Sequence, residues 1–162
     1  NKLYNFEPNA LILSFVNLKG AFFCIKHFAR LASLTGVYSR SIVNIASVYG
    51  LISPDFRIYN DGDRKNSEIY GATKAGLIQM TKYFSTHLSD NGIRVNSVSP
   101  GGIFNPDNPQ SEYFISKYSE RNPMNRMADV KEIIGAILYL SSKASSYTNG
   151  HNLIVDGGMS SW

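Results

Sequence analysis

Short β-branched apolar runs alternate with long stretches of helical periodicity along this chain. The runs cover residues 41–47, 93–98 and 152–155, and apolar residues recur at helical spacing before, between and after the first two runs. Runs of this kind are typical of strands buried on both faces, and their alternation with helices predicts a parallel sheet. We therefore expect a three-layer α/β architecture formed by one domain over residues 1–162.

The helical stretches have recognisable limits. The first runs from Leu11 to Leu34, the second from Glu68 to Leu88, and a short amphipathic helix is expected at residues 110–120. Asp129 and Glu132 predict a capping box at the start of the last helix, which ends near residue 141.

The composition fits a folded globular protein. The 162 residues are 43% hydrophobic and 17% charged, which is enough to bury one core. The net charge is +4, but Lys and Arg are dispersed among Asp and Glu, which argues against a nucleic-acid partner. The apolar stretches are interrupted before they reach the length of a membrane span, so no membrane association is expected. The first residues contain no export signal, so a cytoplasmic location is expected.

Cysteine and histidine usage predicts no metal site. The single cysteine, Cys24, lies in an apolar helical stretch, is expected to be buried, and cannot form an internal disulfide. The histidines at positions 27, 87 and 151 fall on different expected elements, without an acidic partner at a suitable spacing.

Tyr70 and Lys74 place a phenol and an ammonium about one turn apart on the same helix face. A free tyrosine has a pKa of about 10, too high for a base near neutrality, but a nearby cation stabilises the phenolate. Such a pair is also common on solvated helix faces. Support comes from Ser47, which ends the first expected strand, where open α/β sheets place their ligand crevices. Its hydroxyl could hold a substrate oxygen, although a serine there could also simply start a turn.

Four segments occur in the order seen in the short-chain dehydrogenase/reductase family, and the sequence resembles the C-terminal part of that family over nearly its whole length. A further segment in the first helix, residues 16–20, is similar to the family segment that supplies a fourth catalytic residue. The four segments are Ile42-Val-Asn-Ile-Ala-Ser47, Tyr70-x-x-x-Lys74, Asn96-x-Val-x-Pro-Gly101 and Val155-Asp-Gly-Gly158.

The resemblance implies a function for each matching position. Tyr70 would be the general acid/base, Ser47 the hydrogen-bond partner of the substrate oxygen, and Lys74 the modulator of the phenol and a ligand of the nicotinamide ribose. Asn17 would hold a water in the proton relay. The cofactor, NAD or NADP, would exchange a hydride with a secondary alcohol or ketone. The turn that walls the nicotinamide would contain Pro100, Gly101, Gly102 and Ile103, with Asn105 where the family often has a threonine that contacts the carboxamide.

The family's glycine-rich turn for the cofactor pyrophosphate is missing from this sequence. Neither residues 101–102 nor residues 157–158 sit in a strand, glycine turn and helix of the required spacing. The chain is therefore expected to be the C-terminal portion of a doubly wound Rossmann-like fold, a fragment that binds cofactor poorly by itself. The alternative is a truncated, non-catalytic binding or assembly subunit.

The polar segment between residues 51 and 67 is longer than the family usually has, and it lies beside the expected active site. Arg57 and Arg64 could contact an anionic substrate such as a sugar phosphate, and Tyr49 could line the pocket; a solvated surface loop is the alternative. Residues 53–59 and 122–127 look similar to bacterial dehydrogenases of flagellin modification and surface-sugar synthesis. The resemblance also implies a homodimer or homotetramer that acts on a small-molecule substrate. A sugar derivative that contains the secondary alcohol or ketone is a candidate for this substrate.

Overall fold

Three parallel strands form the centre of the protein. The computed structural model describes residues 10–35, 40–63 and 65–162, and its sheet contains β1 (Arg40–Ile45), β2 (Ile93–Pro100) and β3 (Asn152–Val155). They lie in the order β1-β2-β3, and Ile45 of β1 is opposite Val98 of β2. The predicted parallel sheet is confirmed, and β2 is its most buried strand because it has a neighbour on each side.

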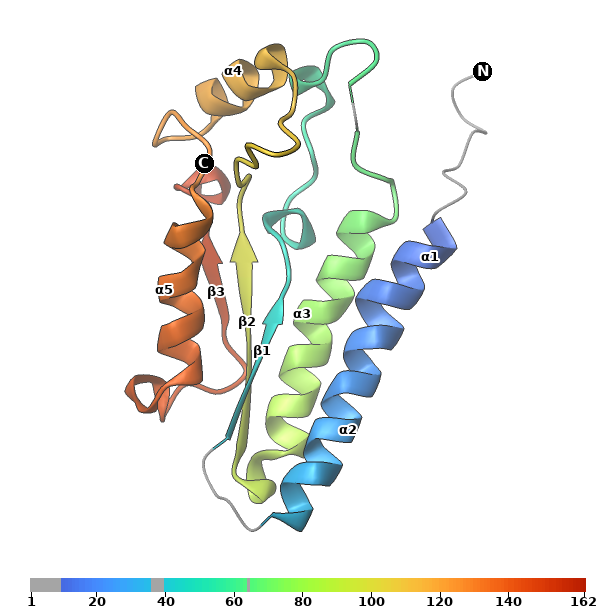
Figure 1. Ribbon diagram of the computed structural model, residues 1–162, viewed down its shortest axis with the longest axis vertical. Coiled ribbons are helices and arrows are strands. Elements are labelled where there is room, and N and C mark those ends of the chain that lie inside the picture. The colour runs from blue at the N-terminus through green and yellow to red at the C-terminus, as the bar shows by residue number, and fades with distance from the viewer. Residues whose placement is uncertain (1–9, 36–39, 64) are drawn as a thin grey trace.

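Helices cover both faces of this sheet. Figure 1 shows α2 (Ala21–Leu34) and α3 (Tyr70–His87) on one side of the sheet and α5 (Val130–Ser141) on the other. The fourth helix, α4 (Glu112–Arg121), lies beyond the carboxyl ends of the strands. The three-layer α/β prediction is thus confirmed.

Two apolar clusters join the layers. One lies between the sheet and the α2 and α3 helices and includes Ile25, Phe84 and Val95. The other lies under α5 and includes Val98 and Leu140. Because apolar residues on both faces of β2 are removed from water, β2 anchors both helical layers.

Short turns connect the main elements. The predicted capping box is present at the start of α5, where the Asp129 side chain accepts from the Lys131 amide and the Glu132 side chain accepts from the Asp129 amide. The 3-10 turns lie at Val48–Gly50 (η2), Phe56–Ile58 (η3), Ser89–Asn91 (η4), Lys143–Ser145 (η5) and Met159–Ser161 (η6).

The first helix differs from its prediction by containing a π-helical turn. Helix α1 (Ala10–Ser14) leads into a π-helix at Phe15–Gly20 and then into α2 without a break. Periodicity alone did not indicate this widened turn, because its side chains still fit a helical pattern. Turns of this type occur frequently at functional sites, and this one contains Asn17.

This same helix corrects two expectations. The segment Ile12–Leu34 is long and apolar enough to cross a membrane by length and composition, with a mean hydropathy of 1.2, so the apolar stretches are not all too short. Only 6% of its most apolar 18-residue stretch is buried in the described structure. Cys24, expected to be buried, is exposed, because α2 buries mainly Ile25 and Ala32.

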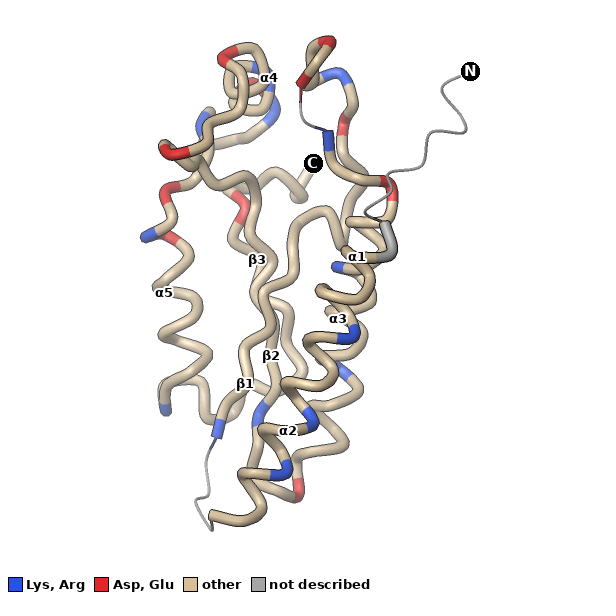
Figure 2. The backbone as a smooth tube through the Cα atoms, turned by 45° about the vertical axis from the view of Figure 1, so that its right-hand side comes forward, with Lys and Arg blue, Asp and Glu red and all other residues tan. Residues whose placement is uncertain are grey.

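Charged side chains are spread over the surface. Figure 2 shows Lys and Arg separated by uncharged stretches along the helices, with most acidic residues near the end at which the strands finish. Along the described backbone, the basic residues therefore do not form a continuous run. The expectation that no nucleic acid binds remains a prediction.

Leu140 and Leu138 lie on the same helix but differ in burial, which provides a matched test of the core. Leu140 is completely buried, whereas Leu138 is 63% exposed. We expect Leu140→Ala to lower the free energy of unfolding by about 2–5 kcal/mol, because it leaves a cavity under α5. Leu138→Ala should change it by less than about 0.5 kcal/mol. Urea unfolding of both variants checks this, and equal losses would contradict the assigned core.

Candidate active site

Ser47 and Tyr70 lie at the wall of one pocket beyond the carboxyl end of β1. The pocket contains about 580 Å³ of space that opens to solvent. Ser47 is buried and lies two residues beyond Ile45, the last residue of β1, while Tyr70 is the first residue of α3. The structure thus brings together two residues that are 23 positions apart and that the sequence assigned to one site.

Close backbone packing between η2 and α3 sets this arrangement. A Cβ atom at Gly71 would lie 2.7 Å from the Tyr49 carbonyl oxygen, and one at Gly50 would lie 2.9 Å from the Ala75 nitrogen. Only glycine permits these approaches. The turn after Ser47 therefore rests directly on the first turns of the helix that starts at Tyr70.

The Ser47 hydroxyl is oriented by its own turn. Its Oγ accepts a hydrogen bond from the Tyr49 amide at 3.2 Å. A hydroxyl that accepts in this way can still donate its hydrogen to another oxygen. Ser47 can therefore act as a donor towards a group in the pocket.

Lys74 lies about one turn beyond Tyr70 on α3. Its Nζ donates to the Ile45 carbonyl at 2.9 Å and lies 5.6 Å from the centre of the Tyr70 ring. Burial lowers the pKa of Lys74 from its ordinary value. The ammonium is therefore held between the end of β1 and the tyrosine ring, in a position to stabilise negative charge there.

Asn17 reaches α3 through a buried threonine. Its amide nitrogen donates to Thr73 Oγ1 at 3.0 Å, and the Thr73 hydroxyl donates to the Tyr70 carbonyl at 2.8 Å. Sequence reasoning missed Thr73, since nothing in the helix pattern distinguishes it from other buried residues. It connects the π-helical turn to the residue at the centre of the site.

The segment after β2 forms the opposite wall. Gly101, Gly102 and Ile103 line the pocket, whereas Pro100 is buried at the end of β2 and is not among its lining residues. The Gly101 amide donates to the Val155 carbonyl at 2.9 Å, and the Gly102 amide donates to the Tyr118 hydroxyl. The segment is thus fixed on both sides.

Aromatic and amide side chains complete the pocket. Tyr49, which the sequence analysis expected to line the pocket, does so, and Tyr59 lines it as well. Tyr113 is not among the lining residues, and its hydroxyl is directed towards the Arg57 carbonyl at 3.5 Å. Burial, followed by the nearby phenols of Tyr59 and Tyr118, raises the pKa of Tyr49. Sequence reasoning missed several polar lining residues, for which no spacing signal existed: Asn66, Gln110 and Tyr118.

Two expected contact residues, Asn105 and Arg57, are not among the lining residues of the pocket. Asn105 is exposed, and its side chain accepts from the Asp107 amide at 3.0 Å, so it caps its own turn. The Arg57 side chain is 84% exposed and pairs with Asp55 at 2.9 Å. Arg64 lies outside the described residues.

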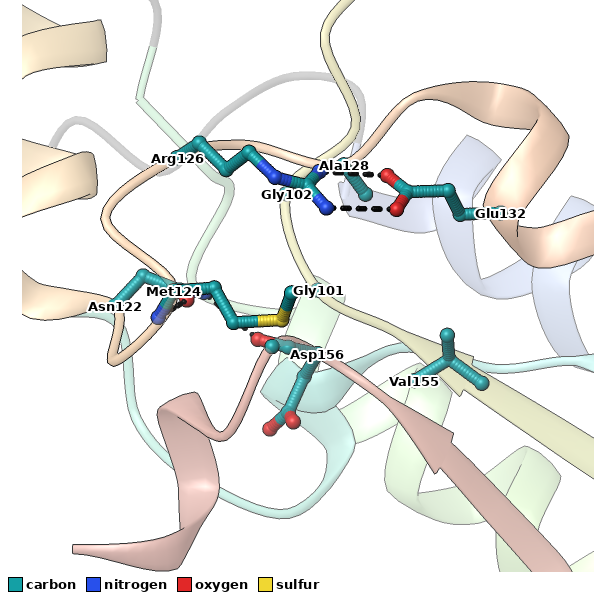
Figure 3. A pocket seen from close by; sticks show the side chains of 10 residues that line it. Gly101, Gly102, Asn122, Met124, Arg126, Ala128, Glu132, Val155 and Asp156 are labelled. Atoms are coloured by element: carbon teal, nitrogen blue, oxygen red, sulfur yellow. Dashed lines mark hydrogen bonds and ion pairs between the residues drawn. The ribbon is translucent and has the colours of Figure 1, made fainter.

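A second hollow lies behind the glycines of the opposite wall. Figure 3 shows Arg126 reaching across it to Glu132, with two hydrogen bonds of 2.6 and 2.7 Å. The Asn122 amide donates to the Asp156 carbonyl at 2.7 Å. These side chains are therefore engaged in hydrogen bonds within the protein, and they hold the segments that pack behind Gly101 in place.

The described residues fit one end of a nicotinamide cofactor. Tyr70 shares a pocket with Gly101, Gly102 and Ile103, and the half-buried Lys74 lies beside it. The sequence provides no glycine-rich turn for the cofactor's pyrophosphate. Within the described ranges, no group of three or more His, Cys, Asp or Glu side chains could hold a metal ion.

Comparison with known proteins decides the family. A family model described as Enoyl-(Acyl carrier protein) reductase matches residues 10–160. This chain belongs to the short-chain dehydrogenase/reductase family. The words of this description belong to the family model, and they assign no substrate to this chain.

Two curated relatives are a sugar reductase and a flagellin modification protein. The NADH-dependent L-xylulose reductase of Ambrosiozyma monospora is 36% identical over 152 residues, which cover 91% of this chain and 53% of the relative. Post-translational flagellin modification protein A of Campylobacter coli is 32% identical over 118 residues, which cover 73% of this chain and 45% of the relative. The chain therefore spans about half the length of these curated relatives.

A solved short-chain dehydrogenase has the same fold. The crystal structure of a short-chain dehydrogenase from Leptospira borgpetersenii with bound NAD+ superposes with a TM-score of 0.86 and 38% identity, over 96% of this chain and 58% of that one. The helix Ile12–Leu34 lies within the matched family region, so it is part of the dehydrogenase domain.

Gly71 and Gly135 provide a matched pair for testing the close packing in the dehydrogenase site. Both lie in helices, but a Cβ at Gly135 would meet nothing within 4 Å. We expect Gly71→Ala to destabilise the protein by about 1–3 kcal/mol and to displace Tyr49. Gly135→Ala should stabilise the protein by about 0.5–1 kcal/mol. Thermal unfolding of both variants is the measurement, and a stabilising Gly71→Ala would refute the contact.

Asp55 should titrate at unusually low pH. Hydrogen bonds from Arg57 lower the pKa of its carboxyl from 3.8 to about 2. Because the folded-state value is depressed, the stabilisation is present above pH 3.8 and is lost as the pH falls through about 2. Carboxyl NMR titration should show a midpoint that returns towards 3.8 in Arg57→Gln and moves less in Arg121→Gln. An unchanged midpoint in Arg57→Gln would contradict the assigned cause.

Proposed function

We propose that this chain carries the catalytic residues of an NAD(P)-dependent oxidoreductase that interconverts a secondary alcohol and a ketone within a sugar derivative. The observation that carries the proposal is the meeting of Ser47 and Tyr70 in one pocket, with the Lys74 ammonium 5.6 Å from the centre of the Tyr70 ring. Family membership supports an oxidoreductase of this type. The whole protein's activity is part of the proposal, because the chain spans about half of its relatives.

In the reducing direction, Ser47 donates a hydrogen bond to the substrate carbonyl oxygen. The Tyr49 amide donates to the Ser47 oxygen and leaves the hydroxyl hydrogen unused. This hydrogen is therefore available for the substrate oxygen. Bound NAD(P)H supplies the hydride to the carbonyl carbon, and NAD(P)+ accepts it in the reverse reaction. Tyr70 donates its phenolic proton to the oxygen, which becomes the alcohol. Oxidation of the alcohol follows the same steps backwards.

Lys74 and Asn17 support the proton transfer. The Lys74 ammonium lies 5.6 Å from the tyrosine ring, so it stabilises the phenolate that remains after the proton has left. Asn17 is connected to the Tyr70 backbone through Thr73. We propose that Asn17 holds the water through which Tyr70 regains its proton. Lys74 also binds the nicotinamide ribose in this proposal.

The cofactor and substrate follow from the site and from the relatives. Gly101, Gly102 and Ile103 would wall the nicotinamide ring, with Pro100 fixing the turn behind them. A relative named for L-xylulose reduction supports a neutral sugar or polyol as the substrate. The similarity to a flagellin modification protein also agrees with a sugar derivative.

A non-catalytic binding or assembly subunit is the second candidate. The observation that favours it is the lack of a glycine-rich pyrophosphate turn in the sequence. The native mass distinguishes the two candidates, together with a titration of NAD(H) and NADP(H). A mass well above that of this chain with cofactor binding supports the enzyme, and a mass equal to this chain without binding supports the subunit.

We also propose that the protein is a homodimer or homotetramer. The apolar side chains exposed on the helix containing α2 support this, because large exposed apolar patches commonly mark contact surfaces. A further segment of the same polypeptide would cover such a surface equally well. The mass of the native polypeptide and the mass of its assembly distinguish this possibility from an oligomer. Cytoplasmic location and the absence of a membrane partner remain predictions from the sequence. The large exposed apolar side chains on this helix are Ile12, Phe15, Val16, Phe22, Phe23, Phe28, Leu31 and Leu34.

Tyr70→Phe tests the proposed chemistry, with Tyr83→Phe as its control on the same helix. Tyr83 is 61% exposed and is not among the pocket's lining residues. We expect Tyr70→Phe to lower kcat for NADH-dependent reduction of L-xylulose and related ketoses by about 10²–10⁴, since it removes the proton donor. Tyr83→Phe should retain full activity. Equal kcat values for Tyr70→Phe and the unaltered enzyme would refute the assigned general acid.

A further inference from the structure

The polar loop before α3 brings an unassigned pair of side chains to the active-site pocket. Tyr59 and Asn66 both line it, and Asn66 Nδ2 donates to Tyr59 Oη at 3.1 Å. Tyr59 is buried, with 8% of its surface exposed, and its hydrogen bond with Asn66 is partly buried. A buried polar group of this kind needs a hydrogen-bonding partner.

Tyr59 retains a hydrogen that it can donate. Its oxygen accepts from Asn66 and is the acceptor in its interaction with the neighbouring Tyr49 phenol, so its own O–H is left to donate to a substrate. Burial raises the pKa of Tyr59, as it does that of Tyr49. These phenols therefore stay neutral and can both donate and accept, as the hydroxyls of a sugar do.

The described lining residues contain no charged side chain. Arg57 is exposed and bound to Asp55, and Arg121 also pairs with Asp55, on the far side of Tyr49. A phosphate or carboxylate would need a cation to replace its hydration. The described part of the pocket is thus suited to an uncharged ligand.

The loop is fixed on both sides of Tyr59. Asp55 pairs with Arg121 of α4, and Asp63 accepts from Ser111 at 3.0 Å. Between them, the Tyr59 ring packs against Phe114 with ring centres 5.2 Å apart. The pair is therefore held in place before a substrate arrives, which lowers the entropic cost of binding.

We propose that Tyr59 and Asn66 are specificity-determining residues that hydrogen-bond a hydroxyl of a neutral polyhydroxylated substrate, and so select it over its phosphorylated counterpart. This inference rests on the proposed function, because it concerns the same pocket. It differs from the expectation that Arg57 and Arg64 bind an anionic substrate: Arg57 is exposed and paired with Asp55, and Arg64 lies outside the described residues.

The test measures binding and turnover separately in the native enzyme. Probes are a neutral ketopentose, L-xylulose, and its 5-phosphate, with Tyr113→Phe as the matched control for Tyr59→Phe. We expect Tyr59→Phe and Asn66→Ala to weaken xylulose binding about three- to tenfold, the worth of one hydrogen bond. The control should bind as the unaltered enzyme does, and the 5-phosphate should bind more weakly than xylulose.

Distinct outcomes identify which proposal fails. Binding of xylulose that depends on Tyr59 and Asn66, without hydride transfer, would overturn the proposed function and leave this inference standing. Turnover with unchanged binding in both variants would overturn only this inference. Tighter binding of the 5-phosphate, or no binding of xylulose by the unaltered enzyme, would also overturn it.

Discussion

The close contact between the η2 turn and the start of α3 is the constraint on which the site depends. Two glycines allow backbone atoms of the turn and the helix to approach within distances that any side chain would prevent. The strand end that carries Ser47 and the helix that begins at Tyr70 are therefore locked together. Lys74 strengthens the same junction by donating to the last residue of β1. The proposed chemistry occupies a rigid junction between two elements instead of a flexible loop.

The pocket above this junction has two kinds of wall. One is built from the ends of β1 and β2, which the sheet positions. The other consists of the polar loop and α4, which hold each other through the Asp55 ion pair, the Asp63 hydrogen bond and the Tyr59–Phe114 contact. The first wall carries groups suited to proton transfer, and the second carries neutral hydrogen-bonding groups. In our proposal, reaction type and substrate preference therefore depend on different parts of the chain.

Helix α2 and its neighbours show how a sequence pattern can be correct for an element and incomplete for its surroundings. Periodicity predicted the helix, but it predicted neither the π-helical turn nor the exposure of Cys24. An apolar pattern records which side chains avoid water in the functional assembly. It does not show which neighbour covers them. The exposed phenylalanines on this helix are therefore compatible with contact to a second copy of the protein or to another segment of the same protein.

The sequence by itself determined the order of strands and helices, the α5 capping box and the motif positions of Ser47, Tyr70 and Lys74. These features depend on local propensity or on residue type at short spacing, and both can be read along the chain. Only the tertiary structure decided which loop residues reach the pocket. It placed Tyr59 and Asn66 there and left Arg57 in solvent beside Asp55. The physical reason is that a loop's side-chain directions are set by long-range contacts with α4, for which no periodicity exists in the sequence.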